Sequence, residues 1–115
     1  MRPMSSSLPQ PAREQLDLSA VLHALSDPVR RGIVASLASY GEIPCACLVL
    51  PVTKSTVSHH FRVLREAGVI AQREEGTRKL STLRTDDLEA RFPGLLPSVL
   101  AASAALPRTG SAAAA

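Results

Sequence analysis

The segment Thr53–Gly68, which reads T-K-S-T-V-S-H-H-F-R-V-L-R-E-A-G, constrains the fold of this 115-residue chain more than any other stretch. Four of its residues recur at the i, i+3, i+4, i+7 spacing of one helix face, namely Val57, His60, Phe61 and Leu64. Thr53 can cap the N-terminus, and Gly68 can end the helix in a left-handed conformation. The segment therefore predicts an amphipathic helix with this stripe buried in a core.

The opposite face of the predicted helix is polar and basic. Its residues are Lys54, Ser55, Ser58, His59, Arg62 and Arg65, and the only acid of the segment is Glu66. Short hydrogen-bonding side chains near a helix N-terminus can read base edges, while cations can contact phosphates. We therefore expect the helix to enter the major groove of duplex DNA; an ordinary amphipathic surface helix is the alternative.

Charge and aromatic content also favour duplex DNA as the partner. The net charge is only +3, but the stretch 54–79 holds six Lys or Arg against three acids. One Tyr, two Phe and no Trp leave few platforms for stacking single-stranded bases. No apolar run reaches membrane-spanning length, and two cysteines without a secretory signal predict a cytoplasmic protein with no membrane partner.

The pattern along the chain predicts one domain between two loose ends. Residues 1–14 are rich in Ser and Pro and are expected to form a disordered arm, and residues 107–115 a disordered Ala-rich tail. Residues 15–106 are expected to form a mainly α-helical domain of about five helices with a small β-hairpin.

The helices before the polar one begin at recognisable caps. A first helix is predicted over Leu16–Leu25, and a second runs from Asp27 and Pro28 to Tyr40. A short third helix is predicted to start near Pro44, followed by a three-residue turn into the polar helix. Two helices joined in this way form a helix-turn-helix.

After Gly68 the periodicity changes to that of strands. Val69–Arg73 and Arg78–Leu83 predict a hairpin, or wing, whose turn contains Gly76. The cations near its tip, Arg73, Arg78 and Lys79, are predicted to contact phosphates; a plain hairpin that closes the core is the alternative.

A last helix is predicted over Leu95–Leu106. It is apolar on nearly all sides, and a small domain has little room to bury such a helix internally. A partner subunit related by a twofold axis is the expected cover.

Three motifs together resemble the ArsR/SmtB-type winged helix-turn-helix regulators of bacteria. They are L-S-D-P-V-R-R at Leu25–Arg31, S-T-V-S-H-H-F-R-V-L-R-E-A-G at Ser55–Gly68, and E-E-G-T-R at Glu74–Arg78. The resemblance implies a homodimer formed by the first and last helices, which binds a palindromic operator as a transcriptional regulator, with repression as its expected action. By this resemblance Ser55, Ser58 and His59 face the bases, and the DNA backbone is contacted by Lys54, Thr56, Arg62 and Arg65.

Members of this family often respond to a metal ion, and the sequence offers four candidate ligands. Cys45 and Cys47 lie two residues apart, and on an α-helix their sulfurs would point about 200° apart and could not meet one ion. Cys47 is better interpreted as a small core residue. The family's arsenic-binding pair would fall at Glu42 and Pro44, which carry no thiol.

The other candidate ligands are His23 and Asp27, which are four residues apart on the predicted first and second helices. Two ligands rarely hold a metal alone, so a solvated histidine near a helix end is the favoured interpretation. The last helix lacks the Asp, His and Glu of the family's second metal site. No cofactor is expected to be required, and a metal-ion effector has no complete site.

Two other classes of function were considered. One is a subunit of a two-component regulator, whose apolar last helix would bind a co-regulator protein. The other is an enzyme, which the sequence does not favour because it shows no Ser/His/Asp set, carboxylate pair or phosphate-binding loop.

Overall fold

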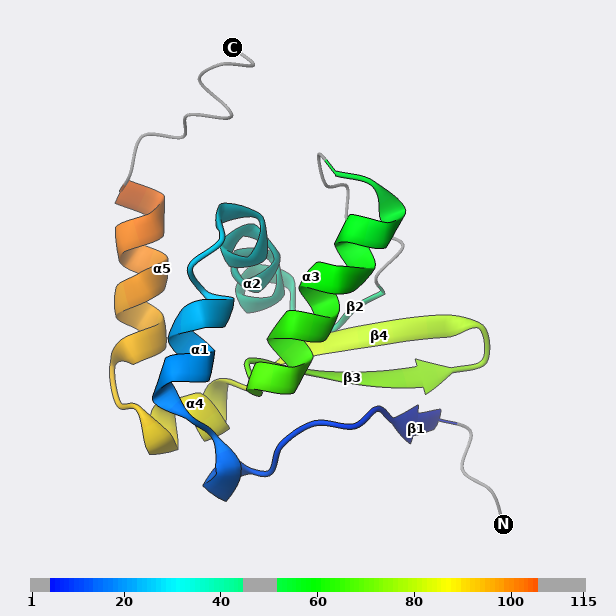
Figure 1. Cartoon of the computed structure of the whole chain (residues 1–115), viewed down its shortest axis with the longest axis horizontal. Helices are drawn as coiled ribbons and strands as arrows, with labels where there is room; N and C mark the ends of the chain where they lie inside the picture. The colour runs from blue at the N-terminus through cyan, green and yellow to red at the C-terminus, as the bar shows by residue number, and fades with distance from the viewer. Residues whose placement is uncertain (1–4, 45–51, 106–115) are drawn as a thin grey trace.

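The computed structural model describes residues 5–44 and 52–105 of the chain. Its elements, in order, are β1 (Ser5–Ser7), the 3-10 helix η1 (Arg13–Gln15), α1 (Leu18–Ala24), α2 (Pro28–Tyr40), β2 (Ile43–Pro44), α3 (Lys54–Ala67), β3 (Ile70–Glu75), β4 (Arg78–Leu83), α4 (Thr85–Arg91) and α5 (Leu95–Ala105). The β3–β4 hairpin extends away from α1, α4 and α5, so that its turn lies at the opposite end of the molecule (Figure 1). Helices followed by such a hairpin form a winged helix-turn-helix, as predicted.

The helix limits follow from local capping. The Asp27 carboxylate accepts hydrogen bonds from the backbone N–H groups of Val29 and Arg30 at the start of α2. Thr53 Oγ1 accepts the N–H of Thr56 at the start of α3. Gly68, with φ of 86°, ends α3 in the left-handed region. These limits confirm the predictions for both helices.

The four strands form one antiparallel sheet in the order β1-β3-β4-β2. The hairpin pairs Ile70 with Leu83 at its base and Glu75 with Arg78 beside the turn. The short strand β2 adds to the outer edge of β4, where Ile43 lies opposite Ser81. Strand β1 adds to the outer edge of β3.

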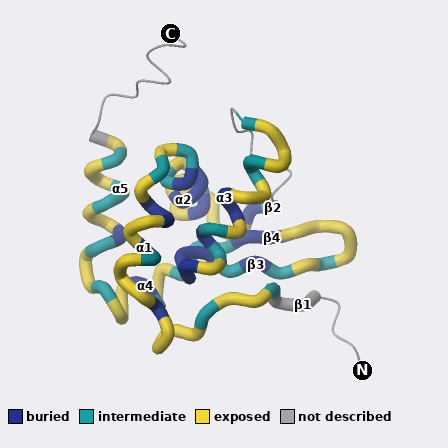
Figure 2. Tube along the Cα trace, in the orientation of Figure 1, coloured by how far each residue is buried: buried dark blue, intermediate teal, exposed yellow. Residues whose placement is uncertain are grey.

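The core lies where α1, α2, α3 and α5 meet the base of the hairpin, and the tip of the wing is exposed (Figure 2). Phe61 and Leu64 are buried on the inner face of α3, as the stripe predicted, and His60 is buried beside them. The same core includes Val21, Ile33, Val34, Leu37, Val69, Ile70, Leu88 and Leu96.

Several expectations require correction. Residues 5–14 are not a disordered arm, because Ser5–Ser7 pair with β3 and residues 13–15 form η1. Ile43 and Pro44 belong to a strand that pairs with β4, whereas the sequence placed them at the start of a helix. The rest of that expected helix, at 45–50, and the expected tail at 107–115 lie outside the described residues.

Candidate nucleic-acid interface

The outer face of α3 presents most of the side chains that were predicted from the sequence to contact DNA. Lys54, Ser55, Ser58, His59 and Arg62 are all exposed. Thr56 is half-buried, and its hydroxyl lies 2.9 Å from that of Thr53 within the helix cap. Thr56 therefore supports the N-terminus of the helix, while the other five side chains form a continuous polar surface that is accessible to a partner.

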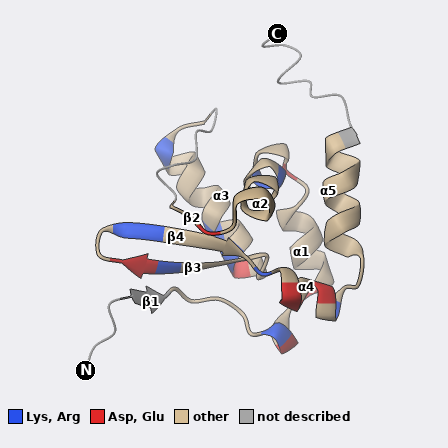
Figure 3. Cartoon of the chain, turned by 180° about the vertical axis from the view of Figure 1, so that it is seen from behind, with Lys and Arg blue, Asp and Glu red and all other residues tan. Residues whose placement is uncertain are grey.

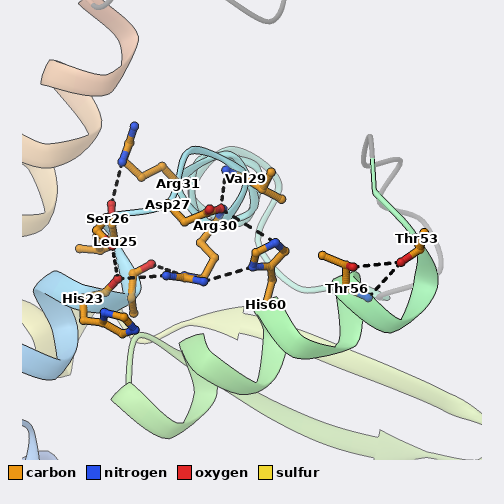
Figure 4. A network of polar contacts seen from close by, with 11 residues as sticks. His23, Leu25, Ser26, Asp27, Val29, Arg30, Arg31, Thr53, Thr56 and His60 are labelled. Carbon is orange, nitrogen blue, oxygen red and sulfur yellow. Dashed lines mark hydrogen bonds and ion pairs between the residues drawn. The ribbon is translucent and has the colours of Figure 1, made fainter.

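A buried polar network holds this helix in place (Figure 4). Arg30 of α2 is buried, and its Nη1 lies 3.2 Å from His60 Nδ1 of α3. Its Nε donates to the Ala24 carbonyl at 2.6 Å, and its Nη2 donates to the His23 carbonyl at 3.1 Å. One guanidinium thus connects the end of α1, the start of α2 and the middle of α3.

The network also defines the state of the imidazole. A guanidinium can only donate, so His60 Nδ1 must be the acceptor and Nε2 must carry the ring proton. Asp27 Oδ2 lies 4.0 Å from that Nε2. Because His60 is fixed by groups behind it, His59 at the preceding position is directed to the outer face. The sequence interpretation missed Arg30, although its place three residues after the Asp27 cap was a usable signal.

The wing carries fewer available cations than the sequence suggested. Arg78 and Lys79 are exposed beside the turn, opposite Glu75 and Glu74 in the strand register. Arg73 does not lie at the tip. It is half-buried in β3, where its guanidinium is paired with carboxylates.

Each of the three nitrogens of the Arg73 guanidinium donates a hydrogen bond to a carboxylate. It binds Glu42 in bidentate fashion, with Nε–Oε2 at 3.0 Å and Nη2–Oε1 at 2.8 Å, and its Nη1 lies 2.8 Å from Glu75 Oε2. Hydrogen bonds to Glu42 and then Glu75 raise the pKa of Arg73, and the bond to Arg73 lowers the pKa of Glu75. We therefore interpret Arg73 as a link between the wing and the start of β2.

Arg65 also differs from expectation, because it is half-buried and turned inward. Its Nε donates to the Pro9 carbonyl at 3.1 Å, and its Nη1 donates to Gln72 Oε1 at 2.8 Å. These two bonds direct the guanidinium towards the sheet and away from the outer surface of α3.

A groove of about 680 Å³ separates α3 from the hairpin. Among the described residues that line it are four cations and no carboxylate, so this part of the surface favours an anion. Seen from behind, Lys and Arg lie along β4 beside the turn and at the first turn of α3, while the acids gather at the end of β3 and on α4 (Figure 3). The lining residues are Pro44, Val57, Ser58, Phe61, Arg62, Arg65, Gln72, Thr77, Arg78 and Lys79.

The candidate metal ligands His23 and Asp27 do not form a metal site with other ligands within the described residues. Asp27 uses its Oδ2 to cap α2, and His23 contributes its backbone carbonyl to the network of Arg30. No group of three His, Cys, Asp or Glu that could hold a metal is present in residues 5–44 and 52–105. Cys45 and Cys47 lie outside these ranges.

Comparison with known proteins agrees with the class that this fold defines. A family model described as a helix-turn-helix domain matches residues 25–73. The uncharacterized HTH-type transcriptional regulator YceK of Bacillus subtilis is 35% identical over 85 residues, which cover 69% of this chain and 82% of that protein. The chain belongs to the HTH-type transcriptional regulators.

Two further relatives align with a smaller share of this chain. The uncharacterized HTH-type transcriptional regulator MJ1325 of Methanocaldococcus jannaschii is 37% identical over 60 residues, covering 50% of this chain and 66% of that protein. A cadmium resistance transcriptional regulatory protein, a CadC homolog of Staphylococcus aureus, is 39% identical over 75 residues, covering 63% of this chain and 60% of that protein. None of the helices among the described residues is both long and apolar enough to span a membrane.

Proposed function

We propose that this chain is a homodimeric repressor of the ArsR/SmtB type that places α3 in the major groove at each half of a palindromic operator. The observation that carries the proposal is the exposed polar face of α3, which is held from behind by the buried contact between Arg30 and His60. A reading helix needs this combination, because exposed side chains discriminate bases only when the helix itself is fixed.

Within this proposal the side chains have different roles. Ser55, Ser58 and His59 lie near the N-terminal half of α3 and are assigned to base edges. Lys54 and Arg62 flank them and are assigned to phosphates, together with Arg78 and Lys79 of the wing. Arg62 of the helix and Arg78 and Lys79 of the wing line the groove, so one DNA strand can run between the helix and the hairpin.

Apolar surface on α1 and α5 supports the proposed dimer. Leu18 and Leu22 of α1 are 46% and 45% exposed. Helix α5 contains no charged residue, and only Leu96 of its residues 95–104 is fully buried. Both helices lie at the end opposite the wing turn, so a partner there would leave the α3 face open (Figure 1).

Selection of duplexes from a random pool, followed by anisotropy titrations at several salt concentrations, tests the proposal. We expect a selected duplex with two related half-sites and an affinity that falls steeply with salt. A chain that binds the selected and random duplexes equally would refute sequence-specific binding. Repeating the selection with divalent ions and with arsenite tests for a metal inducer.

Measurement of the molecular mass in solution tests the proposed homodimer and distinguishes it from a subunit of a two-component regulator. The parent chain should be a dimer, and Leu22→Glu should yield a monomer that binds a single half-site weakly. A parent chain that is monomeric alone would instead favour a subunit of a two-component regulator, in which the exposed apolar residues of α1 and α5 would contact a co-regulator.

A further inference from the structure

The N-terminal strap, defined here as residues 5–13, runs along the outer edge of the wing and past the end of α3 (Figure 1). Beyond β1 the Leu8 N–H donates to the Gln72 carbonyl at 3.0 Å and so continues the pairing with β3. The Pro9 carbonyl then accepts Arg65 Nε at 3.1 Å, and the Pro11 carbonyl accepts Arg84 Nη1 at 2.6 Å. The strap therefore bonds to β3, to α3 and to the segment after β4.

Gln72 lies where these parts meet. It is only 2% exposed, and its Oε1 accepts Arg65 Nη1 from α3 at 2.8 Å. Its Nε2 donates to Ser81 Oγ of β4 at 3.0 Å, and its backbone N–H donates to Gln10 Oε1 of the strap at 3.3 Å. One buried residue thus contacts the reading helix, both wing strands and the strap.

The far end of the strap is fixed by charge and by close packing. Arg13 Nε lies 2.7 Å from Asp87 Oδ1 of α4, and this hydrogen bond is the main cause that lowers the pKa of Asp87. Pro11 and Leu16 pack so closely against Gly68 that a Cβ there would meet both side chains. The strap therefore cannot move without changing contacts at the C-terminus of α3.

We infer that the strap, Arg65 and Gln72 are a positioning device that sets the angle between the reading helix and the wing. Arg62 of α3 and Arg78 of the wing face one groove from two sides, so the spacing of their phosphate contacts depends on this angle. Arg65 is then a positioning residue whose planar guanidinium donates to the strap and to Gln72 at once, which a lysine ammonium cannot reproduce. This inference rests on the proposed binding of DNA.

Two charge-conserving variants on the same helix provide the test. Arg65→Lys keeps the charge but loses the two-sided bond, and we expect the affinity for the selected duplex to fall about tenfold with an unchanged salt slope. Glu66→Asp, the matched control, keeps the charge at an exposed neighbouring position of α3 that has no assigned DNA contact, and it should retain the affinity of the parent. An Arg65→Lys protein that binds like the parent would overturn the inference.

A double-variant cycle with Gln72→Met adds a second readout. Both substitutions break the same contact, so the combined loss of affinity should not exceed the larger single loss, after correction for the folded fraction in urea titrations. If the fold-loss of affinity in the double variant equals the product of the two single fold-losses, the two residues act independently, which would count against the positioning role.

Hydrogen exchange separates failure of this inference from failure of the proposed function. In the absence of DNA, Arg65→Lys should speed exchange of the Leu8 and Gln72 amides, while Glu66→Asp should leave them unchanged. If the parent selects no duplex, DNA binding is refuted, and the exchange rates still decide whether Arg65 ties the strap to the wing. Unchanged rates in Arg65→Lys would refute that tie.

Discussion

Replacement of Arg30 by alanine tests whether the buried network holds the reading helix. The substitution removes the donors to the Ala24 and His23 carbonyls and to His60 Nδ1. Hydrogen bonds from charged groups contribute about 1.5 kcal/mol or more each, so three of them sum to roughly 4–5 kcal/mol. The substitution leaves these neutral acceptors without their donor, and an unsatisfied buried acceptor costs about 1–3 kcal/mol, which is compatible with this sum.

We therefore expect Arg30→Ala to lower the free energy of unfolding by about 4 kcal/mol, a large part of the 5–15 kcal/mol typical of domains. Urea denaturation followed by circular dichroism measures this change. Arg30→Lys should lose about half as much, since one ammonium cannot donate in three fixed directions. The exposed control Arg62→Ala should stay within about 0.5 kcal/mol of the parent. A loss below about 1 kcal/mol for Arg30→Ala would show that the network does not stabilise the fold.

Three further predictions concern other contacts. Hydrogen bonds from Arg13 and Arg84 lower the pKa of Asp87 in the folded state, so the stability that Asp87 contributes is present above its unfolded pKa and is lost as the pH falls through its folded pKa. Asp87→Asn should therefore flatten the dependence of the free energy of unfolding on pH below about pH 4. An unchanged pH dependence would contradict the ion pair. Gly68→Ala should destabilise the fold by at least about 2 kcal/mol more than Gly76→Ala in thermal melts. Both glycines have a positive φ, but of the two only Gly68 has no room for a Cβ. Equal losses of stability would refute the close packing against Gly68. In anisotropy titrations, Arg78→Ala should reduce the slope of log affinity against log salt concentration by about one unit per protomer, and Arg73→Ala should leave this slope unchanged. A slope reduced by Arg73→Ala and not by Arg78→Ala would show that Arg73 is the phosphate contact.

Local signals made much of the fold predictable from the sequence. The Asp27-Pro28 pair set the start of α2, and Thr53 and Gly68 set the limits of α3, because capping depends on residues within one turn. The hairpin followed in the same way from the turn at Gly76. Strand β1 was missed, because its three serines carry no strand pattern and pair only with a β3 that is distant in sequence.

The candidate site was predictable where side chains face outward and not where they find distant partners. The polar face of α3 followed from helical spacing alone. The partners of Arg73 and Arg65 within the chain could not be predicted, because they are distant in sequence: Glu42 lies 31 residues before Arg73, and Pro9 lies 56 residues before Arg65. A cation is available to DNA only if tertiary contacts leave it unpaired, and spacing along one element does not report these contacts.

Base preference at single positions tests the central claim most directly. Affinities of the parent and of His59→Ala are measured for the selected duplex and for every single base-pair variant of one half-site. We expect His59→Ala to lose about 1–3 kcal/mol of discrimination at one or two adjacent positions and to keep it elsewhere. Discrimination that persists unchanged at every position would contradict the assignment of the exposed face of α3 to the bases.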